Sequence, residues 1–256
     1  MLEGLYAGAI SDALARSESV SVSDLEARIE SLLPPIDALQ RFAPRSNIHV
    51  LAEIKRASPS RGDLASIMEP NKLAEIYESA GATGISVLTE GHRFKGSLED
   101  LVSVRAAVGV PLLRKDFIAN EYQLLEARAF GADIALLIVA GLDQSTLKRL
   151  KKFTEELGMT AFIETHDRVE LERALELDSK FVGVNARDLS TFETNRDLFG
   201  ELAYLFPQDV IKVAESAVRN QSDVAHYAQA GADVVLVGEA LVTSDASATL
   251  KSFLEV

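Results

Sequence analysis

The stretch Ala129–Val139 reads AFGADIALLIV and shows the pattern that decides the fold. A glycine closes a helical segment, Ala-Asp follows it, and an unbroken apolar run begins at Ile134. Glycine is favoured just after a helix, where the backbone turns left-handed. A strand that is apolar throughout is typical of a parallel sheet buried on both faces. The stretch therefore predicts the end of a helix followed by a buried parallel strand.

Eight such apolar runs recur along the 256 residues, each followed by a helical pattern. The glycine turn returns in Gln229–Asp233 (QAGAD) and, without the aspartate, in Ser79–Ala82 (SAGA). Alternating strands and helices over about 250 residues predict an α/β fold, the (β/α)₈ or TIM barrel. The predicted strands are His49–Lys55, Gly84–Leu88, Pro111–Lys115, Ile134–Val139, Thr160–Glu164, Phe181–Asn185, Val210–Glu215 and Val234–Gly238.

Residues 1–47 precede the first predicted strand. They carry two amphipathic helical patterns, Leu2–Ala15 and Val22–Leu33, which end at Pro34-Pro35. A helix interior does not tolerate proline, since proline removes a hydrogen bond and clashes with the preceding turn. We expect residues 1–47 to form a helical extension packed on the barrel, over its mouth. Residues 48–256 would form the barrel, and the two parts would make one domain.

The composition limits the classes of function. The chain has no cysteine, which excludes disulfides, thiolate metal sites and a cysteine nucleophile, and its four histidines lack metal-ligand spacing. A net charge of −13 disfavours a nucleic-acid or anionic membrane surface. No signal sequence and no membrane-length apolar run is visible, so we expect a cytoplasmic protein. An anionic ligand would require a local cluster of cations.

Polar residues gather at the ends of five predicted strands, where a (β/α)₈ barrel carries its active site. These strand ends are Glu53-Ile54-Lys55, Arg114-Lys115-Asp116, Glu164-Thr165-His166, Asn185-Ala186-Arg187 and Glu215-Ser216. The alternative is that the charges are structural ion pairs that close the top of the barrel. Five strands ending in this way favour an active site, because burial of unpaired charge is costly.

The spacing of these residues suggests acid and base chemistry. Glu53 and Lys55 lie two apart and so share one face of the first strand, as Asn185 and Arg187 could on the sixth. A lysine beside other cations is expected to have a lowered pKa, and a carboxylate in a partly dry pocket a raised one. The loops after the seventh and eighth strands commonly bind phosphate, and Gly238 would allow close approach of the backbone.

The segments Leu51–Leu64 (LAEIKRASPSRGDL) and Pro111–Ala140 closely resemble indole-3-glycerol-phosphate synthase of tryptophan biosynthesis. The resemblance continues in order and spacing through Ser86–Leu101, Phe162–Asp167, Val182–Glu193 and Val213–Val218. It implies a carboxy-lyase without cofactor or metal. Such an enzyme converts 1-(2-carboxyphenylamino)-1-deoxyribulose 5-phosphate to indole-3-glycerol phosphate, carbon dioxide and water.

The resemblance also implies roles for the strand-end residues. Lys115 would be the general acid that protonates the carbonyl, Glu164 the base, and Lys55 a second acid that also contacts substrate anions. Glu53 and Asn185 would orient these groups. Arg187 and Ser58 would hold the anthranilate carboxylate and Glu215 and Ser216 would complete the pocket, while the aromatic ring would be enclosed by Phe94, Phe117, Leu136 and Leu189.

Two residues depart from the family pattern near the expected phosphate. Ala217 stands where glycine is more usual, and Glu239 follows Gly238 where many members have serine. A methyl group could crowd the backbone donor at 217. A carboxylate beside phosphate is unfavourable unless Glu239 points away and leaves only its N–H at the site.

Several alternatives and smaller expectations accompany this interpretation. Phosphoribosylanthranilate isomerase is another phosphate-binding barrel, but it uses a cysteine that this chain lacks. The other alternative is an inactive barrel that serves as an interaction subunit.

Segment Arg56–Asp63 is polar and would move over the site. His166 is expected to be structural or to support the base, while Asp116 and Asp188 would cap helices or pair with cations. We expect a monomer rather than an oligomer.

Overall fold

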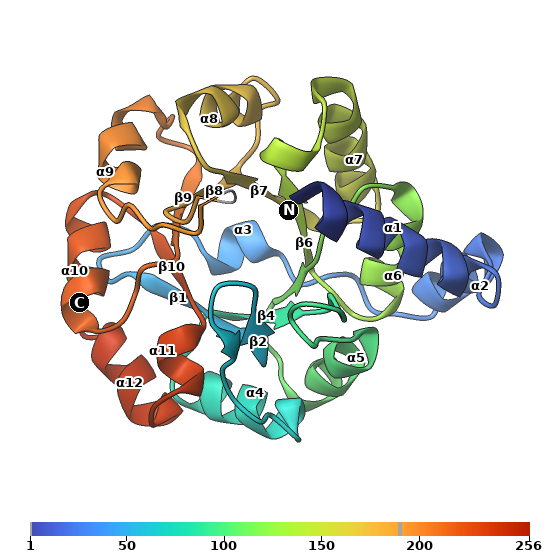
Figure 1. Ribbon diagram of the computed structural model, residues 1–256, viewed down its shortest axis with the longest axis horizontal. Helices are drawn as coiled ribbons and strands as arrows, with labels where there is room; N and C mark the ends of the chain where they lie inside the picture. Colours follow the sequence, from blue (N-terminus) through green and yellow to red (C-terminus); the bar gives the residue numbers. More distant parts are fainter. Residues whose placement is uncertain (1, 189–190) are drawn as a thin grey trace.

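The protein is described by a computed structural model that covers residues 2–188 and 191–256. Eight parallel strands close into a barrel with the helices outside it, which confirms the predicted (β/α)₈ fold (Figure 1). Each predicted strand is present, with ends shifted by no more than one residue. The barrel strands are β1 (His49–Ile54), β4 (Gly84–Leu88), β5 (Leu112–Lys115), β6 (Ile134–Ile138), β7 (Thr160–Thr165), β8 (Phe181–Asn185), β9 (Ile211–Glu215) and β10 (Val234–Val237).

The helices that surround the barrel begin mostly at an Asp, Asn or Ser whose side chain caps the first turn. These elements are α4 (Pro70–Ser79), α5 (Leu98–Ala107), α6 (Glu121–Ala129), α7 (Gln144–Glu156), α8 (Arg168–Leu175), α9 (Leu198–Leu202), α10 (Gln221–Gln229), α11 (Glu239–Val242) and α12 (Ala246–Phe253), with short 3₁₀ turns at Val139–Gly141 and Ala203–Leu205. None of the helices described is long and apolar enough to cross a membrane.

The glycine turns behave as predicted, and their aspartates have a structural task. Gly131 and Gly231 adopt φ of +97° and +91° at the helix ends. The Asp133 carboxylate accepts a hydrogen bond from the N–H of Leu112 at 2.8 Å, at the start of the neighbouring strand. Asp233 does the same for Lys212 at 2.9 Å. Each aspartate thus ties the start of its own strand to the strand beside it, which explains why the GAD turn occurs twice.

Three helices precede the barrel: α1 (Leu2–Ser17), α2 (Val22–Glu30) and α3 (Ala38–Arg41). Helix α1 runs beside the mouth near β6 and over α6 (Figure 1), and the Tyr6 hydroxyl donates to the Ile138 carbonyl at 3.3 Å. Helix α2 ends three residues earlier than predicted. The short α3 leads to Phe42, which packs 5.3 Å from the Phe181 ring inside the barrel. The division into an extension of residues 1–47 and a barrel of residues 48–256 in one domain stays a prediction.

The loop between β1 and α4 contains a small antiparallel hairpin, β2 (Ala57–Ser58) and β3 (Gly62–Asp63), that was not predicted. Its base is held by the Arg56 guanidinium, which donates to Ile67 and to the Asp100 carboxylate. The hairpin lies over the barrel mouth (Figure 1). Movement of Arg56–Asp63 stays a prediction, which hydrogen exchange tests.

Candidate active site

A pocket of about 660 Å³ opens at the carboxyl ends of the strands, a size that suits a small organic ligand. It is lined by every described member of the predicted site: Glu53, Lys55, Ser58, Phe94, Lys115, Phe117, Leu136, Glu164, Asn185, Arg187, Glu215, Ser216, Ala217, Gly238 and Glu239. Leu189, the remaining predicted residue, lies outside the described residues. The structure thus brings the strand ends together, while the role of each side chain stays a prediction.

Lys115 and Glu164 form an ion pair in this pocket. The Lys115 ammonium lies 2.7 Å from one oxygen of Glu164, and the Asn185 amide donates to the other at 3.2 Å. The Ser216 hydroxyl in turn donates to the Asn185 carbonyl oxygen at 2.7 Å. The amide is therefore fixed with its N–H toward the carboxylate of Glu164.

Glu215 is buried beside this pair. Its carboxyl oxygen lies 3.6 Å from the Lys115 ammonium, and it accepts no hydrogen bond from residues 2–188 or 191–256. Burial and the neighbouring Glu164 carboxylate raise the pKa of Glu215 well above its usual range, against the opposing effect of Lys115. Both causes favour the protonated form of Glu215. Gly183 leaves the space that the Glu215 side chain occupies, because an added Cβ there would lie 2.3 Å from a Glu215 oxygen.

The expected pKa directions fail for Lys115 and Glu164, whereas the raised pKa of Glu215 agrees with the expectation for a carboxyl in a dry pocket. Burial alone would lower the pKa of Lys115, but the carboxylates of Glu164, Glu215 and Glu53 outweigh burial and raise it. Burial would raise the pKa of Glu164, but Lys115 and His166 outweigh burial and hold it well below its usual range. Lys115 faces carboxylates rather than cations, so in the free protein the pair rests as ammonium and carboxylate.

His166 contacts Glu164, which fits the expectation that it is structural or supports the base, and it is not among the residues that line the pocket. Its Nε2 lies 3.2 Å from Glu164 and its Nδ1 lies 3.0 Å from Glu170. Burial lowers the pKa of His166, but the two carboxylates outweigh burial and raise it to about 10. His166 is therefore an imidazolium at neutral pH, and it lies at the Glu164 oxygen that also accepts from Asn185, while Lys115 contacts the other oxygen.

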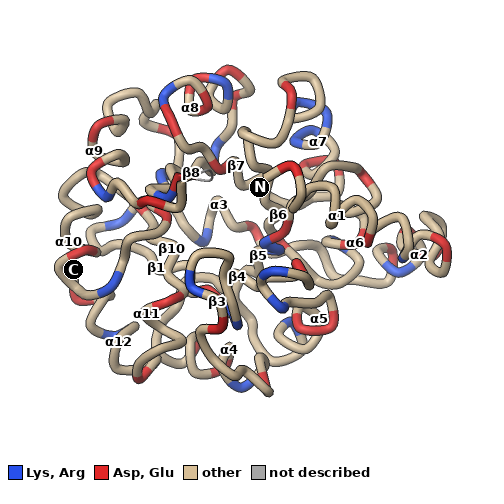
Figure 2. The backbone as a smooth tube through the Cα atoms, in the orientation of Figure 1, with Lys and Arg blue, Asp and Glu red and all other residues tan. Residues whose placement is uncertain are grey.

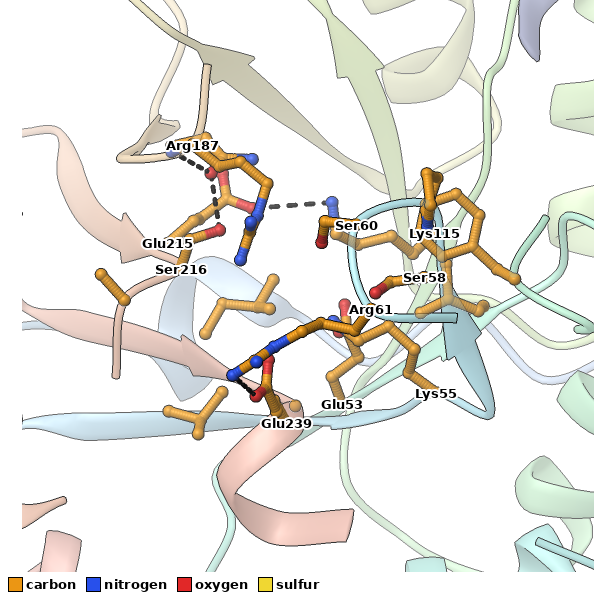
Figure 3. Close-up of a pocket in the computed structure, with 18 of the residues that line it drawn as sticks. Glu53, Lys55, Ser58, Ser60, Arg61, Lys115, Arg187, Glu215, Ser216 and Glu239 are labelled. Atoms are coloured by element: carbon orange, nitrogen blue, oxygen red, sulfur yellow. Dashed lines mark hydrogen bonds and ion pairs between the residues drawn. The ribbon is translucent and has the colours of Figure 1, made fainter. Parts of the chain in front are cut away.

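Glu53 and Lys55 share one face, as predicted. The Lys55 ammonium lies 2.5 Å from a Glu53 oxygen (Figure 3). Gly238 on the neighbouring strand end leaves the space for them, because a Cβ there would lie 2.4 Å from Glu53 and 3.2 Å from Lys55. The requirement at Gly238 is thus side-chain room in addition to the expected approach of the backbone.

Arg187 extends over the opposite side of the pocket (Figure 3). Its backbone N–H donates to the Asn185 side chain at 3.1 Å, and its guanidinium donates to the Phe192 carbonyl at the same distance. These contacts hold the guanidinium over the cavity, and the Phe192 contact uses one of its five N–H donors. Asp188 accepts from the Thr191 N–H at 2.8 Å and so caps the local turn.

An apolar wall completes the pocket. The Phe94 and Phe117 rings pack 6.2 Å apart, and Phe117 meets Tyr6 of α1 at 5.7 Å. Other apolar lining residues are Leu2, Leu5, Leu88, Leu136 and Ile138. The N-terminal helix therefore contributes to the pocket, which sequence reasoning anticipated only as packing over the mouth.

A buried charge chain supports β5 from behind. Arg16 of α1 makes two hydrogen bonds to Glu126, which meets Arg114. Arg114 in turn donates to Asp116 at 2.9 Å. Asp116 thus pairs with a neighbouring cation, as expected, and does not enter the acid and base set.

The far rim of the pocket holds the two departures from the family pattern. Ser216 and Ala217 adopt φ of +68° and +56°, a region that favours glycine because Cβ crowds the backbone there. The loop thus keeps a conformation suited to glycine in spite of Ala217. Glu239 does not point away: its carboxylate accepts from the Arg61 guanidinium at 2.6 Å (Figure 3). Sequence reasoning missed Arg61, although it lies in the SPSRG part of the quoted motif.

Both signs of charge meet at the pocket. Acidic and basic segments lie around the outer helices, and basic segments also lie at the centre beside β3 and β5 (Figure 2). Within the described residues, no group of three or more His, Asp or Glu side chains is placed to hold a metal ion. The arrangement can hold an anionic ligand and move protons.

Comparisons with known proteins agree with this geometry. The sequence profile of the family described as indole-3-glycerol phosphate synthase matches residues 2–253. The indole-3-glycerol phosphate synthase of Leifsonia xyli is 58% identical over 99% of this chain and 97% of its own length. That of Mycolicibacterium gilvum is 54% identical over 95% of this chain and 89% of its own.

A solved structure of N-acetylmannosamine-6-phosphate 2-epimerase from Clostridium perfringens superposes with a TM-score of 0.63 over 86% of this chain and 97% of its own. At 14% identity it supports the barrel fold alone. The sequence profile and the two relatives cover nearly the whole chain, including every strand end that lines the pocket. The chain belongs to the indole-3-glycerol phosphate synthase family.

Proposed function

We propose that this protein is an indole-3-glycerol phosphate synthase, which acts on 1-(2-carboxyphenylamino)-1-deoxyribulose 5-phosphate. The observation that carries the proposal is the Lys115–Glu164 ion pair inside a pocket that has cations at its rim and an apolar wall. The substrate has matching parts: an aromatic ring, a carboxylate, a carbonyl and a phosphate. Family membership supports the same reaction.

The first step joins the aromatic ring to the sugar chain. The ring carbon that bears the carboxylate attacks the C2′ carbonyl carbon, and the carbonyl oxygen takes a proton from the Lys115 ammonium. A positioned ammonium stabilises charge that develops on this oxygen. Arg187 and Ser58 hold the carboxylate, and a guanidinium can grip it through two parallel hydrogen bonds. Phe94, Phe117 and the neighbouring apolar side chains enclose the ring.

Decarboxylation and dehydration complete the reaction. Loss of carbon dioxide returns an electron pair to the ring, and the new hydroxyl leaves as water after it receives a second proton. A proton on C1′ goes to Glu164, which forms the indole double bond. Two protons are donated and one is accepted, so the reaction needs two acids and one base. Lys115 and Lys55 serve as the acids, and Glu164 serves as the base.

The ion pair explains how the site is restored. After one cycle Lys115 lacks a proton and Glu164 carries one, and 2.7 Å separates the two groups. One proton transfer between them returns both to the resting state. Lys55, whose side chain is 19% exposed at the mouth, regains its proton from solvent.

The direct test is to add the carboxyphenylamino-deoxyribulose phosphate and follow indole fluorescence. General acid and base groups contribute about 10² to 10⁴ in rate, and we expect losses of that order for Lys115→Met and Glu164→Gln. Lys151→Met is the matched control, since Lys151 pairs with Glu155 on α7 and does not line the pocket. No product from the unchanged protein at high concentration would overturn the proposal and favour the inactive barrel.

The remaining expectations concern the setting of the enzyme. We infer that it acts on a free small molecule in the cytoplasm as a monomer, and its net charge of −13 disfavours a nucleic-acid or anionic membrane surface as partner. Light scattering after gel filtration should give a mass near 27.7 kDa. A mass of twice that value at working concentration would replace the monomer with a dimer.

A further inference from the structure

Arg61 and Glu239 meet across the mouth of the pocket. Arg61 belongs to the hairpin loop after β1, and Glu239 begins α11 after β10. The guanidinium Nη2 lies 2.6 Å from the Glu239 Oε1, and both residues line the cavity. Figure 3 shows the Arg61 side chain crossing the mouth to reach this carboxylate. The contact joins two segments that lie 178 residues apart in sequence.

The pair is exposed, with 60% of the Arg61 side chain and 36% of the Glu239 side chain accessible, and other charged groups lie near it. Burial lowers the pKa of Arg187, while the nearby Glu239 opposes this shift and the nearby Arg61 adds to it. Lys55 lies beside Gly238. An anion at this rim would therefore meet Glu239 among several cations. Arg61 neutralises that carboxylate with one guanidinium N–H, and four of the five N–H donors of an arginine remain.

We propose that Arg61 binds the phosphate group of the substrate and that Glu239 positions Arg61 for this contact. The inference rests on the proposed function, which supplies a phosphate ester whose anthranilate end lies against the aromatic wall. The phosphate then lies at the opposite rim, bounded by Ser216, Ala217 and Gly238. Glu239 replaces the usual serine without repelling the phosphate, because its charge is cancelled by Arg61.

The proposal predicts that the two partners of the ion pair have unequal effects. Arg61→Gln removes a phosphate contact and exposes the phosphate to an uncompensated carboxylate. We expect KM to rise about tenfold, the equivalent of one charge-assisted contact, with kcat little changed. Glu239→Gln removes both the positioning and the repulsion, which oppose each other, so KM should change by less than about threefold. In Arg61→Gln protein, adding Glu239→Gln should lower KM again.

Lys95→Gln provides a matched control. Lys95 pairs with Asp63 of the same hairpin at 2.5 Å, and it does not line the pocket. The substitution removes one positive charge and one contact that holds the hairpin, as Arg61→Gln does. KM should stay near that of the unchanged protein. If Lys95→Gln raises KM as much as Arg61→Gln, the ion pairs only hold the hairpin and the inference is wrong.

Inorganic phosphate separates this inference from the proposed function. Calorimetric titration needs no turnover, and we expect Arg61→Gln to weaken phosphate binding about tenfold while Lys95→Gln does not. The difference should shrink as salt rises, because the groups are partly exposed. Failure of catalysis with this binding pattern intact would sink the proposed function alone. Equal phosphate binding by the unchanged protein and Arg61→Gln would overturn the inference even if the enzyme is active.

Discussion

Replacement of Lys115 by Met tests whether the ion pair in the pocket is coupled as the geometry indicates. The change leaves Glu164, whose side chain is 2% exposed, without the ammonium at 2.7 Å. Removing one partner of a buried pair costs about 3–5 kcal/mol. His166 remains 3.2 Å from Glu164, so we expect the lower end, about 3 kcal/mol of the free energy of unfolding.

The opposite change, Glu164→Gln, should cost less stability. Lys115 keeps Glu215 at 3.6 Å, and loss of the Glu164 carboxylate leaves burial as the remaining cause that raises the pKa of Glu215. Glu215 can then ionise and serve as the counterion, which limits the loss to about 1 kcal/mol. The double variant leaves no unpaired charge from the original pair, so we expect it within about 1 kcal/mol of the unchanged protein.

Urea unfolding of the four proteins at pH 7 measures these differences as a double-mutant cycle. Activity is a separate readout, since all three variants should lose about 10²-fold or more in rate. The reasoning fails if Lys115→Met is as stable as the unchanged protein. It also fails if the loss in the double variant equals the sum of the two single losses, because the two charges would then be energetically independent.

Three further changes test other parts of the site. The pKa of His166 is raised from 6.5 to about 10, so its contribution to the free energy of unfolding is complete below pH 6.5 and is lost as pH rises toward 10. His166→Gln should abolish this fall of the free energy of unfolding with pH, measured by urea unfolding. If the fall is unchanged in the variant, other groups cause it. Ala217→Gly should stabilise the protein by about 0.5–1 kcal/mol, since relief of a left-handed alanine exceeds the entropy cost of glycine, and a lower melting temperature would contradict this. Gly183→Ala would place a Cβ 2.3 Å from a Glu215 oxygen and so displace the carboxyl group. We expect kcat/KM in the indole assay to fall at least tenfold. Normal activity would show that the pocket adapts to the added methyl group.

Most of the barrel could be predicted because its strands follow a local rule. A parallel strand covered on both faces must be apolar throughout, and the helix before it ends at a glycine. Both features are visible at Gly131 and in the run that follows it. The elements that were missed lack such a rule: α3 is only four residues long, and each strand of the β2–β3 hairpin has two. Periodicity needs more residues than these to appear.

Arg61 shows a different reason for a miss. It lies in a loop, so no strand-end argument points to it, and its partner Glu239 is 178 residues away. From the sequence, the Glu239 carboxylate was expected to disfavour phosphate binding. The sequence did not show that Arg61 lies 2.6 Å from this carboxylate. A local cation was expected to answer the charge of −13. Which cation lies near the proposed phosphate position depends on how the loops after β1 and β10 come together in the fold.

The raised pKa of Lys115 and the lowered pKa of Glu164 have a cause that the barrel geometry itself supplies. Glu53, Glu215, Glu164 and Lys115 come from β1, β9, β7 and β5, which are alternate strands in the barrel order β1-β10-β9-β8-β7-β6-β5-β4. Side chains from alternate strands of a (β/α)₈ barrel fill one layer. Three carboxylates therefore surround one ammonium, and Lys55 enters from just beyond the strand to pair with Glu53. Glu164 is paired with Lys115 and His166, and Glu53 with Lys55. Glu215 has only the more distant Lys115 at 3.6 Å, and burial and the Glu164 carboxylate raise its pKa. The strand ends alone do not show this arrangement, whereas the ends combined with the closed strand order require it.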